Sequence, residues 1–225
     1  MDYIFGYRSL VSRYSRQHYS KILSEATVAT VKGWCRSLCV SYPDEGATYA
    51  GALRDDVGLL NGVLIATDIG EAIADRERGY QFTRLNIDDL LIENLAVGEP
   101  SIGEQGFDGQ GFGEQGRDSF GLSISQQDQI WIYETMQVDT ATPGNPLPQS
   151  YVDTCMSGCL ESQGVDGAIE FIQQTRGWDF VWLNDRHLDR TPRYPRYTPI
   201  SSEHAGLIDS LLEQQGVLKF RQSSP

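Results

Sequence analysis

Long apolar runs, basic residues and histidines are all scarce in this chain, and each scarcity excludes a class of protein. No apolar run approaches the ~20 residues that cross a bilayer as a helix, so no membrane span is expected. The 18 Lys and Arg are outnumbered by 31 Asp and Glu. The resulting formal charge of −13 argues against nonspecific nucleic-acid binding, which needs a positive surface. The three histidines stand in no H-E-x-x-H pattern, so metal catalysis is not expected.

Other signatures of known chemistry are missing as well. The sequence contains neither a G-x-S-x-G nucleophile elbow nor the phosphate-binding G-x4-G-K-[ST] loop. Its start, Met1-Asp-Tyr-Ile4, lacks the basic and apolar regions of a signal peptide. We therefore expect a soluble cytoplasmic protein without membrane or nucleic-acid partners.

Cysteine is also rare, and the four cysteines form two C-x3-C pairs, Cys35/Cys39 and Cys155/Cys159. Four thiolates can bind zinc, and this spacing places each pair on one face of a strand or helix. The alternative, which we favour, is four small buried apolar residues in a reducing compartment.

The beginning of the chain carries the most informative local pattern. Tyr3, Ile4 and Phe5 form a short aromatic and β-branched run that predicts a buried strand, and Gly6 ends it. A strand that stops at glycine and small polar residues leaves backbone N–H groups that can bind an anion or a developing oxyanion. An ordinary surface loop is the alternative interpretation.

Closely spaced strands dominate the first ninety residues. Patterns at 26–31 and 38–42 each predict a strand. The runs at 48–53 and 62–66 flank a polar segment at 54–58, which suggests a hairpin with a long loop. Strands this close in sequence favour a mostly antiparallel, barrel-like sheet over alternating βαβ units.

A short helix is predicted over Asp68–Arg78, with Gly79 ending it. Glu77 falls in its last turn, where the negative end of the helix dipole raises the proton affinity of a carboxylate and suits it to act as a base. The alternative is a solvated glutamate within a run of charges.

The sequence predicts an insertion followed by helices in the second half of the chain. Gly98–Gln127 is polar, glycine-rich and contains a small tandem repeat, which predicts an excursion between two strands. A helix begins at Ser150, breaks near Gly164 and continues, and another follows at 207–213. The segment 175–197 is rich in aromatic and charged residues, and we expect it to pack across the domain, with Asp185 and Arg186 as a possible ion pair.

Several motifs, in order along the chain, resemble the γ-glutamylcyclotransferase-like superfamily, which includes ChaC-type and AIG2-like proteins. Phe5-Gly-Tyr-Arg-Ser-Leu10 resembles F-G-Y-G-S-L, Asn61-Gly-Val-Leu-Ile65 resembles L-N-G-V-L-F, and Asp75-Arg-Glu-Arg-Gly-Tyr80 resembles D-x-R-E-x-G-Y. Segments similar to the C-terminal part of larger bacterial members are Ser150–Cys155, Thr175–Trp178, Leu183–Arg186 and Tyr194–Arg196.

This resemblance implies an α+β fold, a small mixed and largely antiparallel β-barrel with flanking helices. Residues 1–225 would form one domain, with the insertion near 98–127 and a helical C-terminal extension over 149–225. The protein would be a monomer or a homodimer.

The resemblance also implies a reaction. A γ-glutamyl amino acid, peptide or amine would cyclise to 5-oxoproline and release a free amine, with no metal or organic cofactor. Glu77 would be the general acid/base, and loop amides would hold the carboxylate or oxyanion of the substrate. The residues implied in substrate binding are Tyr7, Arg8, Ser9, Leu10 and Tyr80.

One departure from the family pattern leaves alternatives open. Arg8 stands where the family has glycine, and a positive φ there would strain an arginine. Its side chain would block the pocket or pair with a substrate carboxylate. A non-catalytic member that binds a small molecule or a protein is therefore the second hypothesis. Hydrolysis or acyl transfer at a γ-glutamyl amide is a lesser third.

Overall fold

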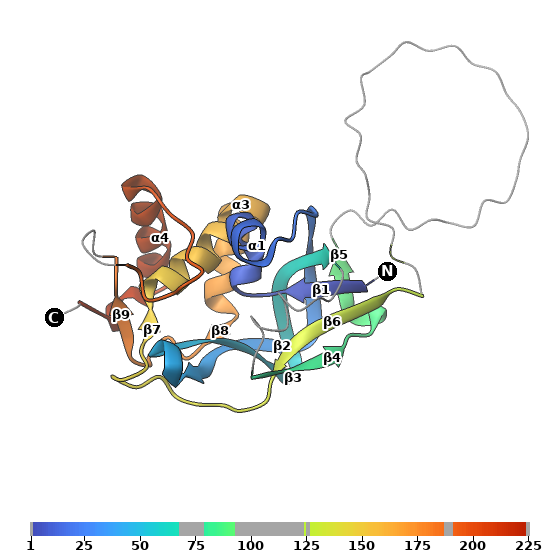
Figure 1. The fold of residues 1–225 in the computed structure, drawn as a ribbon, viewed down its shortest axis with the longest axis horizontal. Coiled ribbons are helices and arrows are strands. Elements are labelled where there is room, and N and C mark those ends of the chain that lie inside the picture. Colours follow the sequence, from blue (N-terminus) through green and yellow to red (C-terminus); the bar gives the residue numbers. More distant parts are fainter. Residues whose placement is uncertain (1, 68–78, 93–123, 125–126, 187–190, 224–225) are drawn as a thin grey trace, which may run out of the picture.

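The computed structural model describes residues 2–67, 79–92, 124, 127–186 and 191–223 of the 225-residue chain. These residues form an α+β fold that combines one larger mixed sheet with helices (Figure 1). The helices in the described part are α1 (Arg13–Ser20), α3 (Gln149–Gln173) and α4 (Ser202–Gln214). The predicted helix over Asp68–Arg78, Glu77 within it, and nearly all of Gly98–Gln127 lie outside the described residues.

The sheet is mixed and largely antiparallel, as expected. Its order is β4-β6-β1-β3-β2-β5, and β8 also pairs with β2. Its strands are β1 (Asp2–Gly6), β2 (Ala26–Tyr42), β3 (Ala47–Ala66), β4 (Tyr80–Arg84), β5 (Leu90–Ile92), β6 (Gln129–Thr135) and β8 (Thr175–Arg176). Within the described residues the order ends on two unpaired edges, β4 and β5, so a closed barrel is not confirmed.

Two long strands, β2 and β3, form the main hairpin and correct one prediction. They are joined at the turn after Tyr42, where Pro43–Glu45 forms a short 3-10 helix and Gly46 adopts a left-handed conformation (φ 59°). The predicted hairpin loop at 54–58 is wrong, because β3 continues in one direction through it. The pairing shifts register there, from Lys32↔Leu59 to Trp34↔Arg54, so the polar residues form an irregularity in the strand.

The predicted N-terminal strand is confirmed as β1, which lies in the middle of the sheet. It pairs antiparallel with β3 and parallel with β6. Tyr3, Ile4 and Phe5 are buried, as their aromatic and β-branched character requires. Gly62 on β3 allows this close packing, since a Cβ at that position would lie 2.8 Å from the Phe5 ring.

The helices follow local signals in the sequence. Ser12 caps α1 by accepting a hydrogen bond from Ser15 N at 3.2 Å. The break predicted near Gly164 is present, because Gly164 has non-helical angles (φ 69°, ψ −161°) inside α3. Tyr151, Cys155 and Cys159 on the first part of α3 are buried, as their apolar spacing predicts.

Glycine 158 determines how closely α3 approaches the residues after β1. A Cβ there would lie 2.5 Å from Val11 C and 2.7 Å from Ser12 Cα. We expect Gly158→Ala to lower the free energy of unfolding by about 1–3 kcal/mol, because backbone cannot give way as a side chain can. Gly206→Ala is the matched control: nothing lies within 4 Å of its Cβ. In a helix, this change is expected to stabilise by roughly 0.5–1 kcal/mol. Urea unfolding of both variants measures the change in the free energy of unfolding. Equal changes for Gly158→Ala and Gly206→Ala would contradict the packing argument.

The C-terminal segment packs across the domain, as predicted. Trp178, Trp182 and Tyr194 are buried. A second sheet joins this part in the order β10-β9-β7, whose strands are β7 (Leu147–Pro148), β9 (Trp182–Asn184) and β10 (Arg221–Ser223). This small sheet and α4 lie together at one end of the molecule (Figure 1).

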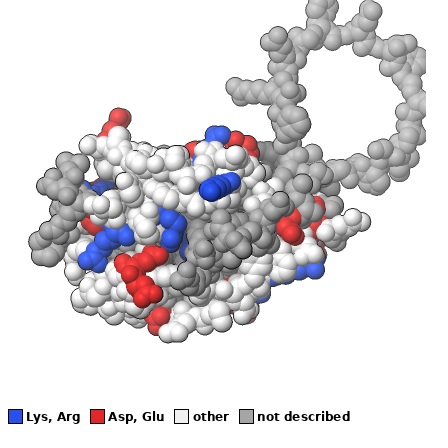
Figure 2. Space-filling view, in the orientation of Figure 1, with Lys and Arg blue, Asp and Glu red and all other residues white. Residues whose placement is uncertain are grey.

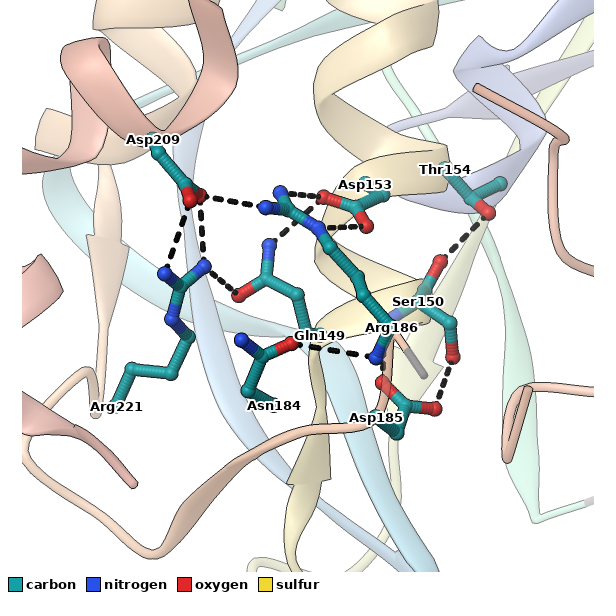
Figure 3. A network of polar contacts seen from close by, with 9 residues as sticks. All are labelled: Gln149, Ser150, Asp153, Thr154, Asn184, Asp185, Arg186, Asp209 and Arg221. Atoms are coloured by element: carbon teal, nitrogen blue, oxygen red, sulfur yellow. Dashed lines mark hydrogen bonds and ion pairs between the residues drawn. The ribbon is translucent and has the colours of Figure 1, made fainter. Parts of the chain in front are cut away.

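A network of charged side chains holds this end of the molecule, and it corrects a second prediction (Figure 3). Arg186 pairs with Asp153 and, at 2.8 Å, with Asp209 rather than with its neighbour Asp185. Arg221 also pairs with Asp209, at 2.7 Å. The Asp185 carboxylate instead accepts hydrogen bonds from Ser150 N at 2.8 Å and Ser150 Oγ at 2.6 Å. The network therefore ties α3, β9, α4 and β10 to one another.

The surface charge and the helices both bear on which partners the protein can have. On the face drawn in Figure 2, basic side chains lie next to acidic ones. Among the described residues, no helix combines the length and apolarity that crossing a membrane requires.

Candidate functional site

The loop that follows β1 lies where two other strands converge. Past the end of β1, β3 and β6 meet directly at the pair Ala52↔Glu134. Tyr7 lies at this junction: its hydroxyl donates to Tyr133 O of β6 at 2.7 Å and accepts from Ala52 N of β3 at 3.1 Å. Burial raises the pKa of Tyr7 to about 12, so the phenol stays protonated and anchors the loop.

Arg8 and Tyr80 are brought together although 72 residues separate them. Arg8 Nη1 donates to the Tyr80 hydroxyl at 3.2 Å, and the guanidinium lies 4.1 Å from the centroid of the Tyr80 ring. Tyr80 in turn donates to Ala50 O at 2.9 Å. Burial acts to lower the pKa of Arg8, but the surrounding tyrosines, Tyr80 first, act in the opposite direction and the pKa is raised. This contact joins the first sequence motif to the strand that follows Glu77.

Arg8 does not adopt the positive φ considered for it: its φ is −139° and its ψ is −138°. The side chain lies against Tyr80, buried to 5% exposure.

Ser9 and Leu10 are both buried and differ in what they contact. The Tyr194 hydroxyl donates to Ser9 Oγ at 2.6 Å, which links the loop to the C-terminal segment. Leu10 belongs to the hydrophobic core. Of the predicted site residues, the structure thus brings together Tyr7, Arg8, Ser9, Leu10 and Tyr80, while Glu77 lies outside the described residues.

A cluster of tyrosines surrounds the loop, and the sequence did not predict it. Its rings contact one another in a chain with centroid distances between 4.8 and 6.4 Å. The members are Tyr42, Tyr49, Tyr80, Tyr151 and Tyr194. Burial raises the pKa of Tyr80 and of Tyr151. The only signal in the sequence was the number of tyrosines, 11 in 225 residues, because the members come from separate elements.

Two buried arginines, also not predicted as site residues, bind the carbonyl groups of the loop. Arg36 of β2 donates from Nε to Tyr7 O at 2.6 Å. Arg16 of α1 donates from Nη1 to Leu10 O and Val11 O, both at 2.8 Å. The one signal for Arg36 was a charged residue inside an otherwise apolar strand pattern.

The cysteines do not contribute a metal site in the described part of the chain. All four are buried, as expected for small apolar residues, and none forms a disulfide. No cluster of three or more His, Cys, Asp or Glu suited to a metal ion occurs among the described residues.

Comparison with known proteins finds several solved structures that are similar to this chain. No protein-family model and no curated protein matches the chain. The chain is similar to a solved structure titled gamma-glutamyl cyclotransferase, with a TM-score of 0.49 and 11% identity over 92% of this chain and 98% of that one. It is also similar to YkqA from Bacillus subtilis (TM-score 0.47, 14% identity, 76% of this chain and 52% of that one). An uncharacterised protein from Homo sapiens gives a TM-score of 0.45 and 10% identity over 92% of this chain and 96% of that one.

All three likenesses have TM-scores below 0.5 and identities of 10–14%. The chain spans about half the length of YkqA.

Proposed function

We propose that this protein is a γ-glutamylcyclotransferase-like enzyme that converts a γ-glutamyl amino acid, peptide or amine to 5-oxoproline. The observation that carries this proposal is the contact between Arg8 and Tyr80, at 3.2 Å from Nη1 to hydroxyl. It joins the two motifs to which the resemblance assigns the site. Since three residues of chain span at most about 11 Å, Tyr80 limits how far Glu77 can be from the loop.

The reaction would be an intramolecular aminolysis. The α-amine of the substrate attacks its own γ-carbonyl, a C–N bond forms within the five-membered ring, and the γ-amide C–N bond breaks. Both reacting groups belong to one molecule, so a loop that holds the substrate curled supplies much of the rate by positioning. No water is consumed, and the products are 5-oxoproline and the free amine.

Glu77 would move the proton that this reaction needs. The α-amine is a cation at neutral pH and becomes a nucleophile only after losing a proton. A carboxylate close to it binds the ammonium, accepts that proton and returns it to the leaving amine. The amides of the loop Tyr7–Leu10 would hold the carboxylate or the oxyanion. Arg8 and Tyr80 would contact the substrate beside them.

A panel of γ-glutamyl amines, dipeptides and glutathione tests the proposal. We expect 5-oxoproline, detected by mass spectrometry, to form from at least one of them. Free glutamate or a new conjugate would instead support hydrolysis or acyl transfer. Binding of 5-oxoproline with no turnover across the panel would favour the non-catalytic alternative, and the absence of both would contradict the enzyme and that alternative as a binder of this ligand.

A further inference from the structure

Two opposite charges, Arg196 and Glu45, lie beside the cluster of tyrosines. Arg196 belongs to the C-terminal segment, and Glu45 lies in the turn between β2 and β3. Arg196 Nη2 is 3.6 Å from Glu45 Oε1, which is longer than an N–H···O hydrogen bond, so the ion pair is a loose one. The two side chains are 21% and 27% exposed. They are therefore partly buried and still accessible to a small molecule.

Arg196 has more hydrogen-bond donors than acceptors around it. Its Nε is buried and finds no acceptor among the described residues. The other oxygen of its ion-pair partner is already in use, because Glu45 Oε2 accepts from the Tyr49 hydroxyl at 2.6 Å. A buried donor without an acceptor costs free energy. A carboxylate from a ligand would satisfy it, since the planar guanidinium can bind both carboxylate oxygens.

Tyr42 connects this ion pair with the candidate site. Its ring lies 6.4 Å from that of Tyr80 and 5.3 Å from that of Tyr49, between centroids. Its hydroxyl lies 3.9 Å from the place that a Cβ on Gly79 would take. Gly79 is two residues after Glu77 in the sequence. One tyrosine ring therefore separates the candidate site from the residue that binds Glu45.

The charges around Tyr42 also join the two places. Burial raises the pKa of Tyr42, while the guanidiniums of Arg8 and Arg196 both act to lower it. Tyr194 makes a second connection: the Arg196 guanidinium lies 5.3 Å from its ring centroid, and its hydroxyl donates to Ser9 Oγ. Arg196 thus borders the candidate site on the side of the C-terminal segment.

We propose that Arg196 is a specificity-determining residue that binds a carboxylate on the leaving group, the part of the substrate released as a free amine. This inference rests on the proposed function for the reaction. Of the substrates proposed above, it selects those whose leaving amine carries a carboxylate over those that release a simple amine.

The leaving group would extend past Tyr42 toward Arg196. In a γ-glutamyl amino acid the leaving carboxylate is two bonds from the amide nitrogen, and each further residue of a peptide adds at most about 3.6 Å. Glu45 has the opposite effect on this preference. It neutralises Arg196 in the absence of ligand, and it repels a second carboxylate placed there.

The test compares γ-glutamyl-alanine with γ-glutamyl-alaninamide, which has nearly the same shape and no leaving-group charge. The ratio of their kcat/KM values measures the preference. We expect the wild type to favour γ-glutamyl-alanine and Arg196→Gln to lose about tenfold of this ratio, with the rate on the amide retained. Arg196→Lys keeps the charge without the planar fork, so it is expected to retain part of the preference.

Arg193→Gln is the matched control, because it removes the same charge from the same segment. Arg193 is exposed, and its Nη1 donates to Gly46 O at 3.0 Å, next to Glu45 in the turn. We expect this variant to keep the wild-type ratio. An equal loss in Arg193→Gln and Arg196→Gln would show a general effect of net charge and overturn the inference.

Glu45→Gln separates ligand binding from a structural role of the ion pair. Glutamine can still accept from Tyr49 but no longer neutralises Arg196, so we expect the ratio to rise severalfold. A pair that only holds the turn against the C-terminal segment would leave the ratio unchanged in both Glu45→Gln and Arg196→Gln, or lower it in both. Either result overturns the inference. Thermal unfolding shows whether each variant folds, and if Arg196→Gln does not, Arg196→Lys and Glu45→Gln decide the question.

The same measurements separate this inference from the proposed function. Turnover of both compounds with a ratio that Arg196→Gln leaves unchanged supports the enzyme and overturns the inference. If neither compound is turned over, their binding is compared by calorimetry in the wild type and in Arg196→Gln. A preference for γ-glutamyl-alanine that this variant loses then supports the carboxylate site without the enzyme, and the absence of a preference overturns it.

Discussion

Replacing Glu77 with glutamine is expected to slow 5-oxoproline formation by a factor of roughly 10² to 10⁴, the usual contribution of a general acid/base. Glutamine has nearly the same size but cannot accept the ammonium proton or return it to the leaving amine. The loop residues are untouched by this change. The affinity of the variant for 5-oxoproline, which carries no ammonium group, is therefore expected to stay close to that of the wild type.

Glu25→Gln is the control for this variant. Glu25 is exposed and pairs with the exposed Arg13 at 2.7 Å, so its replacement is expected to leave the rate unchanged. Initial rates of both variants and their thermal unfolding are compared with the wild type. Full activity of Glu77→Gln would remove this residue from the mechanism, even if the protein proved to be a cyclotransferase.

Arg186→Met is expected to lower the free energy of unfolding by about 3–5 kcal/mol, the usual effect of removing one partner from a buried ion pair. Asp153 is the partner left behind, and its side chain is only 4% exposed. Burial raises the pKa of Asp153 even with Arg186 present. Methionine fills similar space but offers no charge, so the remaining carboxylate would be buried with Gln149 as its other donor, at 2.7 Å.

The deficit of this variant should depend on pH. Without Arg186 the pKa of Asp153 in the folded state rises further above its unfolded value. Folding is then disfavoured above that raised pKa, and the deficit shrinks as the pH falls through it. Urea unfolding at neutral and acidic pH measures this trend.

Arg176→Met serves as the control for Arg186→Met, because the Arg176 side chain, which pairs with Asp55, is 62% exposed and should contribute under about 1 kcal/mol. A loss at Arg186 no larger than that at Arg176 would contradict the role given to the network.

Elements with strong local patterns were predictable from the sequence. The buried run at Tyr3–Phe5 depends on neighbouring residues, and the structure has the corresponding strand. The interruption of α3 at Gly164 was also visible locally, because glycine lacks the Cβ that disfavours a positive φ.

Features that depend on distant contacts were not predictable. The run Arg54-Asp-Asp-Val-Gly58 has the composition of a turn, yet β3 continues through it because the flanking residues pair with β2 on both sides. Arg186 was assigned to its sequence neighbour, whereas its partners come from α3 and α4. Arg36 gave no sign of its contact with Tyr7, 29 residues away. The candidate site is therefore visible as motifs, while the groups that hold it in place emerge only from the fold.

The burial of the cysteines has a practical consequence for redox chemistry. Burial raises the pKa of Cys155 and of Cys159 to about 12, so both thiols remain protonated at any ordinary working pH. Oxidants and alkylating reagents attack the thiolate, which the folded protein scarcely offers at these positions. Glutathione and its disulfide can therefore be tested on the folded protein without mixed disulfides forming at this pair.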